Sequence, residues 1–387
     1  MGLKLSKIYV FSLYSALIGQ VCMLVGLPFQ ISLITTLGTY LIVGASFLCL
    51  GVWLFEGEHN DVHGKLLFVF VIIFTLLSLT YSWVFSFEIF IKVLTFWELP
   101  IFLLTAEKIK SKRAKKVIYA INMFYPILFA VLLASPISHR YFDEYGIVEH
   151  ENITLGYGNP NETSVYLMVN FIVLLAAVIR FHNIFLKIVC FLEAAFVAYL
   201  IFLTDSRAAM IVVISVALIS ILFERMHLNR LILLCVFAIP IFFFFALKWF
   251  PNATIFGEAF DTGRAEMYIR VFEQMNFGKF LLGDFAEFRL ENMHNALLSI
   301  FASIGVMGAI VFVVILYRQV KKLEKTVALK ERRVFLIGVL AVIIHSSVEA
   351  AVLVSGTAYA TLFFTLYYLA IDDSKEKECS LYENTTC

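Results

Sequence analysis

The sequence predicts an all-helical, polytopic membrane protein, and its composition carries that prediction. Apolar residues make up 61% of the 387 residues and the mean hydropathy is +0.90, whereas an ordinary soluble domain is roughly 45–50% apolar. Charged residues are only 15% of the chain and gather between long apolar runs. We therefore expect a single transmembrane domain over residues 1–387. The net charge of +1 indicates no particular partner, and we expect no nucleic acid among the partners.

The membrane spans follow from the lengths of the apolar runs. A spanning helix needs about 20 mostly apolar residues, and on that rule the chain offers about twelve candidates. The run 89–106 is the weakest, because it contains Glu98 and Pro100. The candidates are residues 8–27, 31–55, 66–86, 89–106, 117–135, 164–180, 184–204, 208–223, 231–250, 295–317, 334–355 and 357–371.

The positions of lysine and arginine predict the orientation. Basic residues fill the loops 108–116 and 318–333, and lysines also precede the first apolar run. With twelve spans, all three basic segments share one side, and the acidic loop 136–163 lies on the other. The positive-inside rule then places both termini in the cytoplasm and the loops 136–163 and 251–294 outside. The first run lacks a small-residue cleavage site, so we expect it to be retained.

The external segment 251–294 combines polar and apolar residues. Around Asp261 to Phe277 the two kinds alternate in a way that favours a helix lying on the membrane surface. Four of the six cysteines fall inside apolar runs and are expected to be small buried side chains. Since no His, Cys or carboxylate cluster has metal-ligand spacing, we expect neither a metal nor another cofactor.

A first candidate motif, Asp205-Ser206-Arg207, stands between two apolar runs. An arginine at the edge of the hydrocarbon normally has a partner or a cavity. It can serve a substrate, pair with Asp205, or extend to the lipid headgroups. The motif gains functional meaning only together with the arginines of the later external segment.

Those arginines begin with Gly263-Arg264. A guanidinium group grips two phosphate oxygens in a bidentate fork, which lysine cannot do. Arg264 is therefore a candidate for binding an anionic substrate. Arg270 and Arg289 are further substrate-binding candidates, although contact with water or headgroups is the simpler interpretation for both.

The most specific element is His294-Asn295, followed by nine residues and then Gly305 and Gly308. The two glycines are three apart on an expected membrane helix, which predicts close approach of another helix. The histidine precedes the start of that helix, where the dipole favours a neutral imidazole, the form that acts as a base.

This pattern resembles the C-terminal signature of the O-antigen ligase and polymerase superfamily of bacterial envelopes. The chain is also similar to that family in the order of its motifs, although Asn276-Phe-Gly278 stands where the family often has a proline. The similar motifs are Asp205-Ser206-Arg207, Thr262-Gly263-Arg264, Leu282-Gly283-Asp284 and His294, with Gly156-Tyr-Gly-Asn-Pro-Asn161 upstream of them.

The resemblance implies a glycosyltransferase of the bacterial cytoplasmic membrane that needs no metal. It would join undecaprenyl-diphosphate-linked oligosaccharides to a glycan acceptor at the outer face, by an inverting transfer. Arg207 and Arg264 would hold the diphosphate and His294 would be the general base. Ser206, Arg270, Asn295 and Arg289 would bind substrate. Membrane lipids are expected partners, and a chain-length regulator is a further one that such an enzyme can have.

Three functions stay open at this stage. The Gly156–Asn161 stretch and the short chain favour a capsule or O-antigen polymerase over a ligase that transfers glycan to a lipid A core. A transporter or flippase of lipid-linked sugars is the alternative from another class, because His345, Glu349 and Glu193 stand inside apolar runs. The absence of repeated halves and of midplane breaks in the sequence disfavours that alternative.

Overall fold

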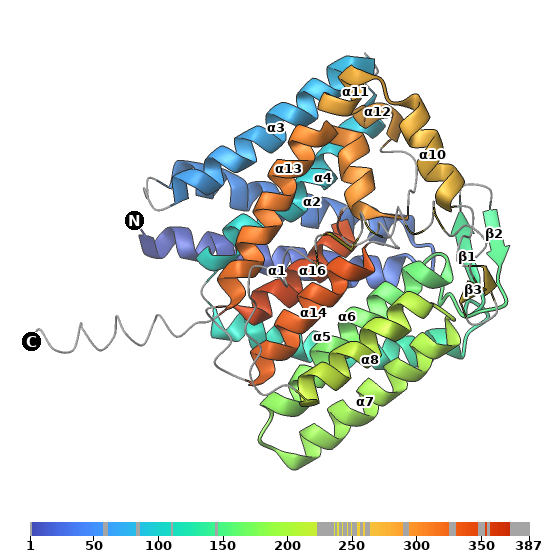
Figure 1. Ribbon diagram of the computed structural model, residues 1–387. Helices are drawn as coiled ribbons and strands as arrows, with labels where there is room; N and C mark the ends of the chain where they lie inside the picture. The colour runs from blue at the N-terminus through green and yellow to red at the C-terminus, as the bar shows by residue number, and fades with distance from the viewer. Residues whose placement is uncertain are drawn as a thin grey trace, which may run out of the picture.

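The computed structural model describes most of the chain. The described residues are 2–56, 61–82, 86–109, 111–143, 146–222, 254–255, 258–259, 264–288, 294–324, 330–346 and 357–371, with the single positions 236, 238, 239, 242, 246, 249 and 353. Over these residues the chain is mostly helical, with two short antiparallel hairpins (Figure 1). The predicted all-helical class is therefore confirmed.

The helices are α1 (Gly2–Gly26), α2 (Ser32–Phe55), α3 (Val62–Ser82), α4 (Phe87–Thr105), α5 (Lys112–Leu133), α6 (Pro160–Arg180), α7 (Ile184–Leu203), α8 (Arg207–Leu222), α10 (Arg264–Gln274), α11 (Phe277–Leu282), α12 (Phe285–Phe288), α13 (Ala296–Glu324), α14 (Lys330–His345) and α16 (Thr357–Ala370). The strands are β1 (Arg140–Asp143), β2 (Gly146–Glu149), β3 (Thr254–Ile255) and β4 (Glu258–Ala259).

Within the described ranges, 8 helices are long and apolar enough to cross a membrane, namely α1 to α7 and α13. They match the first seven predicted spans and the span 295–317. Three further predicted spans correspond to shorter apolar helices, Arg207–Ile221, Arg333–His345 and Ala358–Ala370. The predicted span 231–250 lies largely outside the described residues. The chain is thus a multi-pass membrane protein, and the number twelve stays a prediction.

Two basic segments that are far apart in the sequence meet at one end of the helical body, which we call the basic end. Lys322 in the last turn of α13 pairs with Glu107, just after α4, at 3.2 Å between Nζ and Oε1. Lys108 pairs with Glu56 at the end of α2, at 3.1 Å between Nζ and Oε2. The basic segments predicted on one side of the membrane therefore lie together, and which side that is stays a prediction.

The other end, which we call the hairpin end, contains β1 and β2. Helix α5 leaves the basic end and leads into this hairpin, whose strands are joined by a salt bridge from Arg140 to Glu149 (2.6 Å). After the hairpin, the backbone N–H of Ile153 donates to the carbonyl of Leu203 at the end of α7 (3.4 Å). The end of α7 and the start of α6 are thus placed at the hairpin end.

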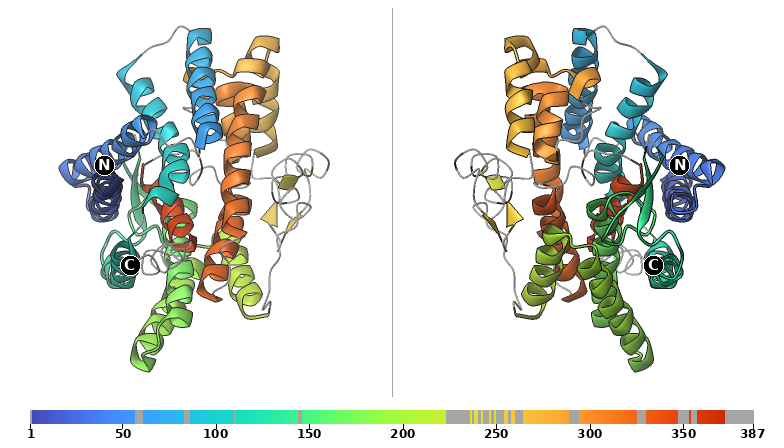
Figure 2. Two further views of the ribbon diagram at one scale, coloured as in Figure 1. Left: turned by 90° about the vertical axis from the view of Figure 1, so that its left-hand side faces the viewer. Right: turned by 90° about the vertical axis from the view of Figure 1, so that its right-hand side faces the viewer.

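Helix α3 and the later helices α11, α12 and α13 pack together although they are far apart in the sequence. Figure 2 shows them on one side of the molecule, with α7 on the opposite side. Aromatic side chains fill the space between α4 and this group, where the Phe96 ring lies 5.6 Å from Phe285 of α12 and 5.8 Å from Phe312 of α13, measured between centroids. The short helices α11 and α12 are therefore part of the body of the protein.

The two ends make the predicted orientation testable. Lys112 at the basic end and Glu149 at the hairpin end, whose side chain is 71% exposed, can each be replaced by cysteine in a variant without the native cysteines. In whole cells we expect an impermeant thiol reagent to label Glu149→Cys and to leave Lys112→Cys unlabelled until the cells are opened. Labelling of Lys112→Cys in intact cells would refute the orientation.

Candidate functional site

The motif Asp205-Ser206-Arg207 lies at the hairpin end, where α8 begins against α6. The hydroxyl of Ser164, in the second turn of α6, donates to the hydroxyl of Ser206 (3.1 Å), and Ser206 is only 1% exposed. The carbonyl of Ser206 accepts from the N–H of Met210, the first turn of α8 (3.0 Å). Arg207 is then the first residue of α8. The serine therefore holds the start of α8, and with it Arg207, in place.

Helix α14 brings the start of α13 toward the hairpin end. Near the start of α14, the Phe335 ring lies 6.3 Å from Tyr119 of α5, close to the basic end. From there α14 runs toward the hairpin end, and just past it the carbonyl of Ser346 accepts from the N–H of Ala296, the first residue of α13 (2.8 Å). His294, two residues before Ala296, is thus on the hairpin-end side.

Asn295 caps this helix start. Its side-chain oxygen accepts from the N–H of Leu298 (3.1 Å), and the residue is 2% exposed. Asparagine is among the preferred N-cap residues for this reason. Ser206 and Asn295 were both predicted to bind substrate, but their described contacts support a role in positioning Arg207 and His294.

The residues two positions before these helix starts, Asp205 and His294, have a left-handed backbone, as do Gln30 and Leu155 among the described non-glycine residues. The φ angle is 54° at Asp205 and 45° at His294. A non-glycine residue pays roughly 1–2 kcal/mol for such a conformation, and strained residues of this kind cluster at functional sites. Asp205 and His294 both belong to motifs identified in the sequence. The fold therefore holds both motifs in turns whose backbone conformation is energetically unfavourable.

Helix α13 is broken ten residues after it begins. Ile304 has φ −126° and ψ 15°, and Gly305 has φ 68° and ψ 177°, a conformation open essentially only to glycine. The turn between α11 and α12 packs into the break. A Cβ on Gly305 would lie 2.1 Å from the carbonyl oxygen of Leu281, and a Cβ on Gly283 would lie 2.5 Å from the backbone nitrogen of Gly305. Because both residues are glycines, the backbone of the turn and the backbone of α13 can cross in direct contact.

The crossing also gives a hydrogen-bond partner to one carbonyl group beside the break. The N–H of Asp284 donates to the carbonyl of Ala302 (2.9 Å), which an unbroken helix would pair with a residue of its own. The predicted close approach at Gly305 is therefore present, but its partner is a turn and not a helix. At Gly308 the nearest atoms to an added Cβ belong to Ile304 of α13 itself, and close approach of a neighbouring helix there stays a prediction.

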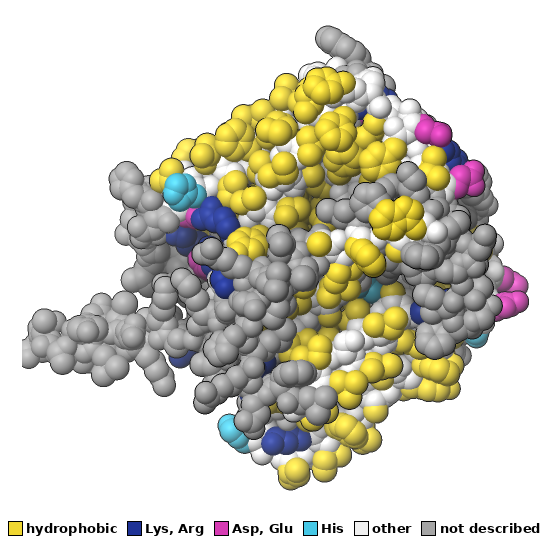
Figure 3. Space-filling view, viewed as in Figure 1, with side chains coloured by type: hydrophobic (Ala, Val, Ile, Leu, Met, Phe, Trp, Pro, Cys, Tyr) yellow, Lys and Arg dark blue, Asp and Glu magenta, His cyan; other side chains and the backbone are white. Residues whose placement is uncertain are grey.

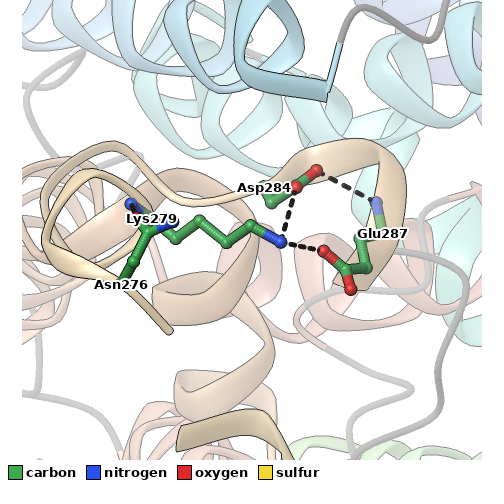
Figure 4. A network of polar contacts seen from close by, with 4 residues as sticks. All are labelled: Asn276, Lys279, Asp284 and Glu287. Carbon is green, nitrogen blue, oxygen red and sulfur yellow. Dashed lines mark hydrogen bonds and ion pairs between the residues drawn. The ribbon is translucent and has the colours of Figure 1, made fainter. Parts of the chain in front are cut away.

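A buried ion network holds the same turn together (Figure 4). The ammonium of Lys279 on α11 lies 3.2 Å from a carboxylate oxygen of Asp284 and also pairs with Glu287 of α12. The second oxygen of Asp284 accepts from the N–H of Glu287 (3.2 Å), and the N–H of Lys279 donates to the side chain of Asn276 (2.9 Å). The side chains of Lys279 and Asp284 are only 16% and 3% exposed. The network therefore fixes the turn that occupies the break.

The electrostatics agree with this geometry. Burial lowers the pKa of Lys279, but the hydrogen bonds and charges of Glu287 and Asp284 outweigh it and raise the pKa above its ordinary value. The ammonium therefore stays charged between the two carboxylates. Sequence reasoning assigned no role to Lys279, and it named Asp284 only as part of the motif Leu282-Gly283-Asp284.

Helix α10 packs along the first segment of α13, before the break (Figure 1). The rings of Phe272 on α10 and Phe301 on α13 lie 6.0 Å apart. A small apolar cluster joins the two helices and α12. It consists of Val271, Phe288 and Ala302, with Met267, Met275 and Leu298 packed against it.

This packing gives the two helices a common direction. The last residue of α10 is followed within three residues by α11, which leads to the break at Gly305. Both α10 and the first segment of α13 thus run toward the break, and their starts lie at the far end from it. Those starts are Arg264, the first residue of α10 that the structure describes, and His294.

The upstream motif has a structural explanation. Gly156 has φ 76°, and a Cβ there would lie 2.8 Å from the backbone of Pro28. Tyr157 is buried, with its ring 4.7 Å from that of Tyr166 on α6. Glycine at this position therefore lets the loop pack tightly before α6 begins. The stretch supports the hairpin end through its buried residues Gly156 and Tyr157.

The remaining predicted residues are placed as follows. Arg270 is exposed on α10, while Arg289, Gly263 and Glu349 lie outside the described residues. In the part of the chain that the structure describes, no group of three or more His, Cys, Asp or Glu side chains could hold a metal ion. No family model matches the chain, and no curated protein matches it.

The break in α13 should depend on glycine at position 305. In Gly305→Ala the backbone alone costs about 1–3 kcal/mol, and the clash with Leu281 adds to that. We expect a clearly lower unfolding temperature for the purified protein in detergent. Gly44→Ala is the matched control, because its Cβ would meet nothing within 4 Å. Equal unfolding temperatures for the two variants would contradict the crossing.

Proposed function

We propose that the chain is a membrane glycosyltransferase that joins lipid-diphosphate-linked glycan units, as a polysaccharide polymerase at the outer face of the bacterial cytoplasmic membrane. One observation carries the proposal: Arg207 is the first residue of α8, His294 lies two residues before α13, and Arg264 is the first residue of α10 that the structure describes. A helix start has partial positive charge and free N–H groups, and it is a common place for phosphate to bind. An arginine at the same place adds a fork for two phosphate oxygens.

The positive charge suits the proposed leaving group. In the transfer, an acceptor hydroxyl attacks the anomeric carbon of the donor, a new C–O bond forms, and the bond to the diphosphate breaks. The diphosphate leaves with the electron pair of that bond, so it is more negative in the transition state than in the bound donor. Arg207 and Arg264 would bind that added charge and so accelerate the reaction.

His294 would take the proton of the attacking hydroxyl. A general base has to be neutral and within hydrogen-bond reach of that proton. The left-handed turn at His294, the cap by Asn295 and the contact of Ala296 with Ser346 fix the position of the backbone that carries the imidazole. These contacts support a defined position for His294. A general base needs such a position, whereas a histidine that only contacts the membrane interface does not.

The donor and the acceptor come from the resemblance of the motifs to the O-antigen ligase and polymerase superfamily. It implies undecaprenyl diphosphate as the lipid, a second lipid-linked unit as the acceptor, and an inverted product. The Gly156–Asn161 stretch favours the polymerase over the ligase. Both termini would then be cytoplasmic, and segment 251–294 would face outward.

The base assignment predicts a large loss of activity from a small change. General-base catalysis is worth roughly 100- to 10,000-fold, so His294→Ala should nearly abolish elongation of purified lipid-linked units while donor binding persists. His294→Gln keeps a hydrogen-bonding side chain but cannot accept the proton in the same way. It should be nearly as inactive as the alanine variant. Substantial turnover by the glutamine variant would remove His294 as the base.

The diphosphate assignment predicts that lysine cannot replace Arg264. Arg264→Lys keeps the charge but loses the planar fork, so we expect at least a 10-fold loss of polymer formation at equal protein level. Arg113→Lys is the matched control, because Arg113 is exposed at the basic end, away from the candidate site, and it should retain activity. Normal polymer from Arg264→Lys would rule out the fork.

A further inference from the structure

Helix α10 has three distinct faces. Met267, Tyr268 and Val271 pack inward against the first segment of α13 and α12. One exposed flank is polar and bears Glu266, Arg270 and Glu273. At the helical repeat of 3.6 residues, the other flank carries Ile269 and Phe272, which are 43% and 40% exposed. The exposed surface of α10 is thus divided into a charged side and an apolar side.

The apolar side continues onto α11. Phe277 is 78% exposed and Phe280 is 42% exposed. Phe301 of α13 joins the two helices, because its ring lies 6.0 Å from Phe272 and 5.5 Å from Phe280. We call Ile269, Phe272, Phe277 and Phe280 the aromatic edge.

The aromatic edge adjoins a surface that already belongs to the membrane. Helix α11 packs against α3 and α13, which are both membrane-spanning candidates. Figure 3 shows hydrophobic side chains gathered over α3 and its neighbours, whereas acidic and basic side chains gather over α10. The large apolar residues that α3 exposes are Val62, Leu66, Val69, Phe70, Ile73, Leu76 and Leu77.

We propose that the aromatic edge inserts into the lipid leaflet at the hairpin end, so that α10 and α11 form an interfacial element and not a loop in water. Large exposed apolar side chains are costly in water and favourable at the headgroup and acyl boundary. The charged flank of α10 remains available to water and headgroups. Lipid is the occupant that continuity with α3 and α13 indicates, and a second protein would have to cover the edge without covering that flank.

The experiment adds one tryptophan and measures its surroundings in lipid vesicles. Phe277→Trp keeps an aromatic side chain at an exposed position, and Glu273→Trp is its control on the charged flank. Each variant is compared with the parent protein, whose four tryptophans form a common background. The measured quantity is the added emission and its quenching, first by lipids brominated in the acyl chain and then by acrylamide in the water.

For Phe277→Trp we expect blue-shifted added emission, quenched several-fold more by brominated lipid than that of Glu273→Trp and several-fold less by acrylamide. Phe280→Trp should behave in the same way and provides a second site if the first variant folds poorly. Equal quenching of Phe277→Trp and Glu273→Trp by acrylamide would overturn the proposal. So would shielding of Phe277→Trp from both quenchers, because a protein surface would then cover the edge. Neither result depends on glycan transfer, so the test is independent of the proposed reaction.

Discussion

The crossing of two backbones at Gly283 and Gly305 is the constraint on which the candidate site depends. A membrane helix cannot be interrupted in an apolar environment unless its freed backbone groups find partners. The turn between α11 and α12 supplies one through the bond from Asp284 to Ala302. Because the turn lies in the break, the first segment of α13 leaves the line of the helix and packs along α10. That packing puts His294 and the first described residue of α10, Arg264, at the same end of the two helices, away from the break.

The ion network explains why this turn is held in one arrangement. Two carboxylates in a single turn, one of them buried, would repel each other, and the buried one would be costly to remove from water. Lys279 offsets both, because its ammonium contacts Asp284 and Glu287 at once. The same ammonium lies over the ring of Phe288, with Nζ 5.7 Å from the ring centroid. A buried network of this kind specifies geometry more than it adds stability. That is the property a turn needs when it positions a neighbouring helix.

Hydropathy alone predicts the parts of the fold that depend on burial in lipid. Helices α1 to α7 match apolar runs of spanning length, and even Glu98 and Pro100 do not interrupt α4. The break in α13 could not be predicted in this way, because Ile304 and Gly305 lie inside an uninterrupted apolar run and only contact with a distant turn reveals it. The roles of Ser206 and Asn295 could not be predicted either. A polar residue beside an arginine or histidine can bind substrate or can cap a helix, and the sequence does not distinguish the two.

Several locally unfavourable choices occur at the motifs that the proposed reaction uses, while left-handed backbones also occur at Gln30 and Leu155. A cation at a helix start opposes the dipole by roughly 0.3–1 kcal/mol, and both Arg207 and Arg264 stand there. Asp205 and His294 add left-handed backbones. The surroundings compensate through the Ser164–Ser206 bond, the Asn295 cap and the Ala296–Ser346 bond. Unfavourable local choices that occur together and are held in place by compensating contacts are typical of functional sites. A structural element alone would gain by replacing these arginines with acidic or neutral residues, whereas a site for a diphosphate would lose by it.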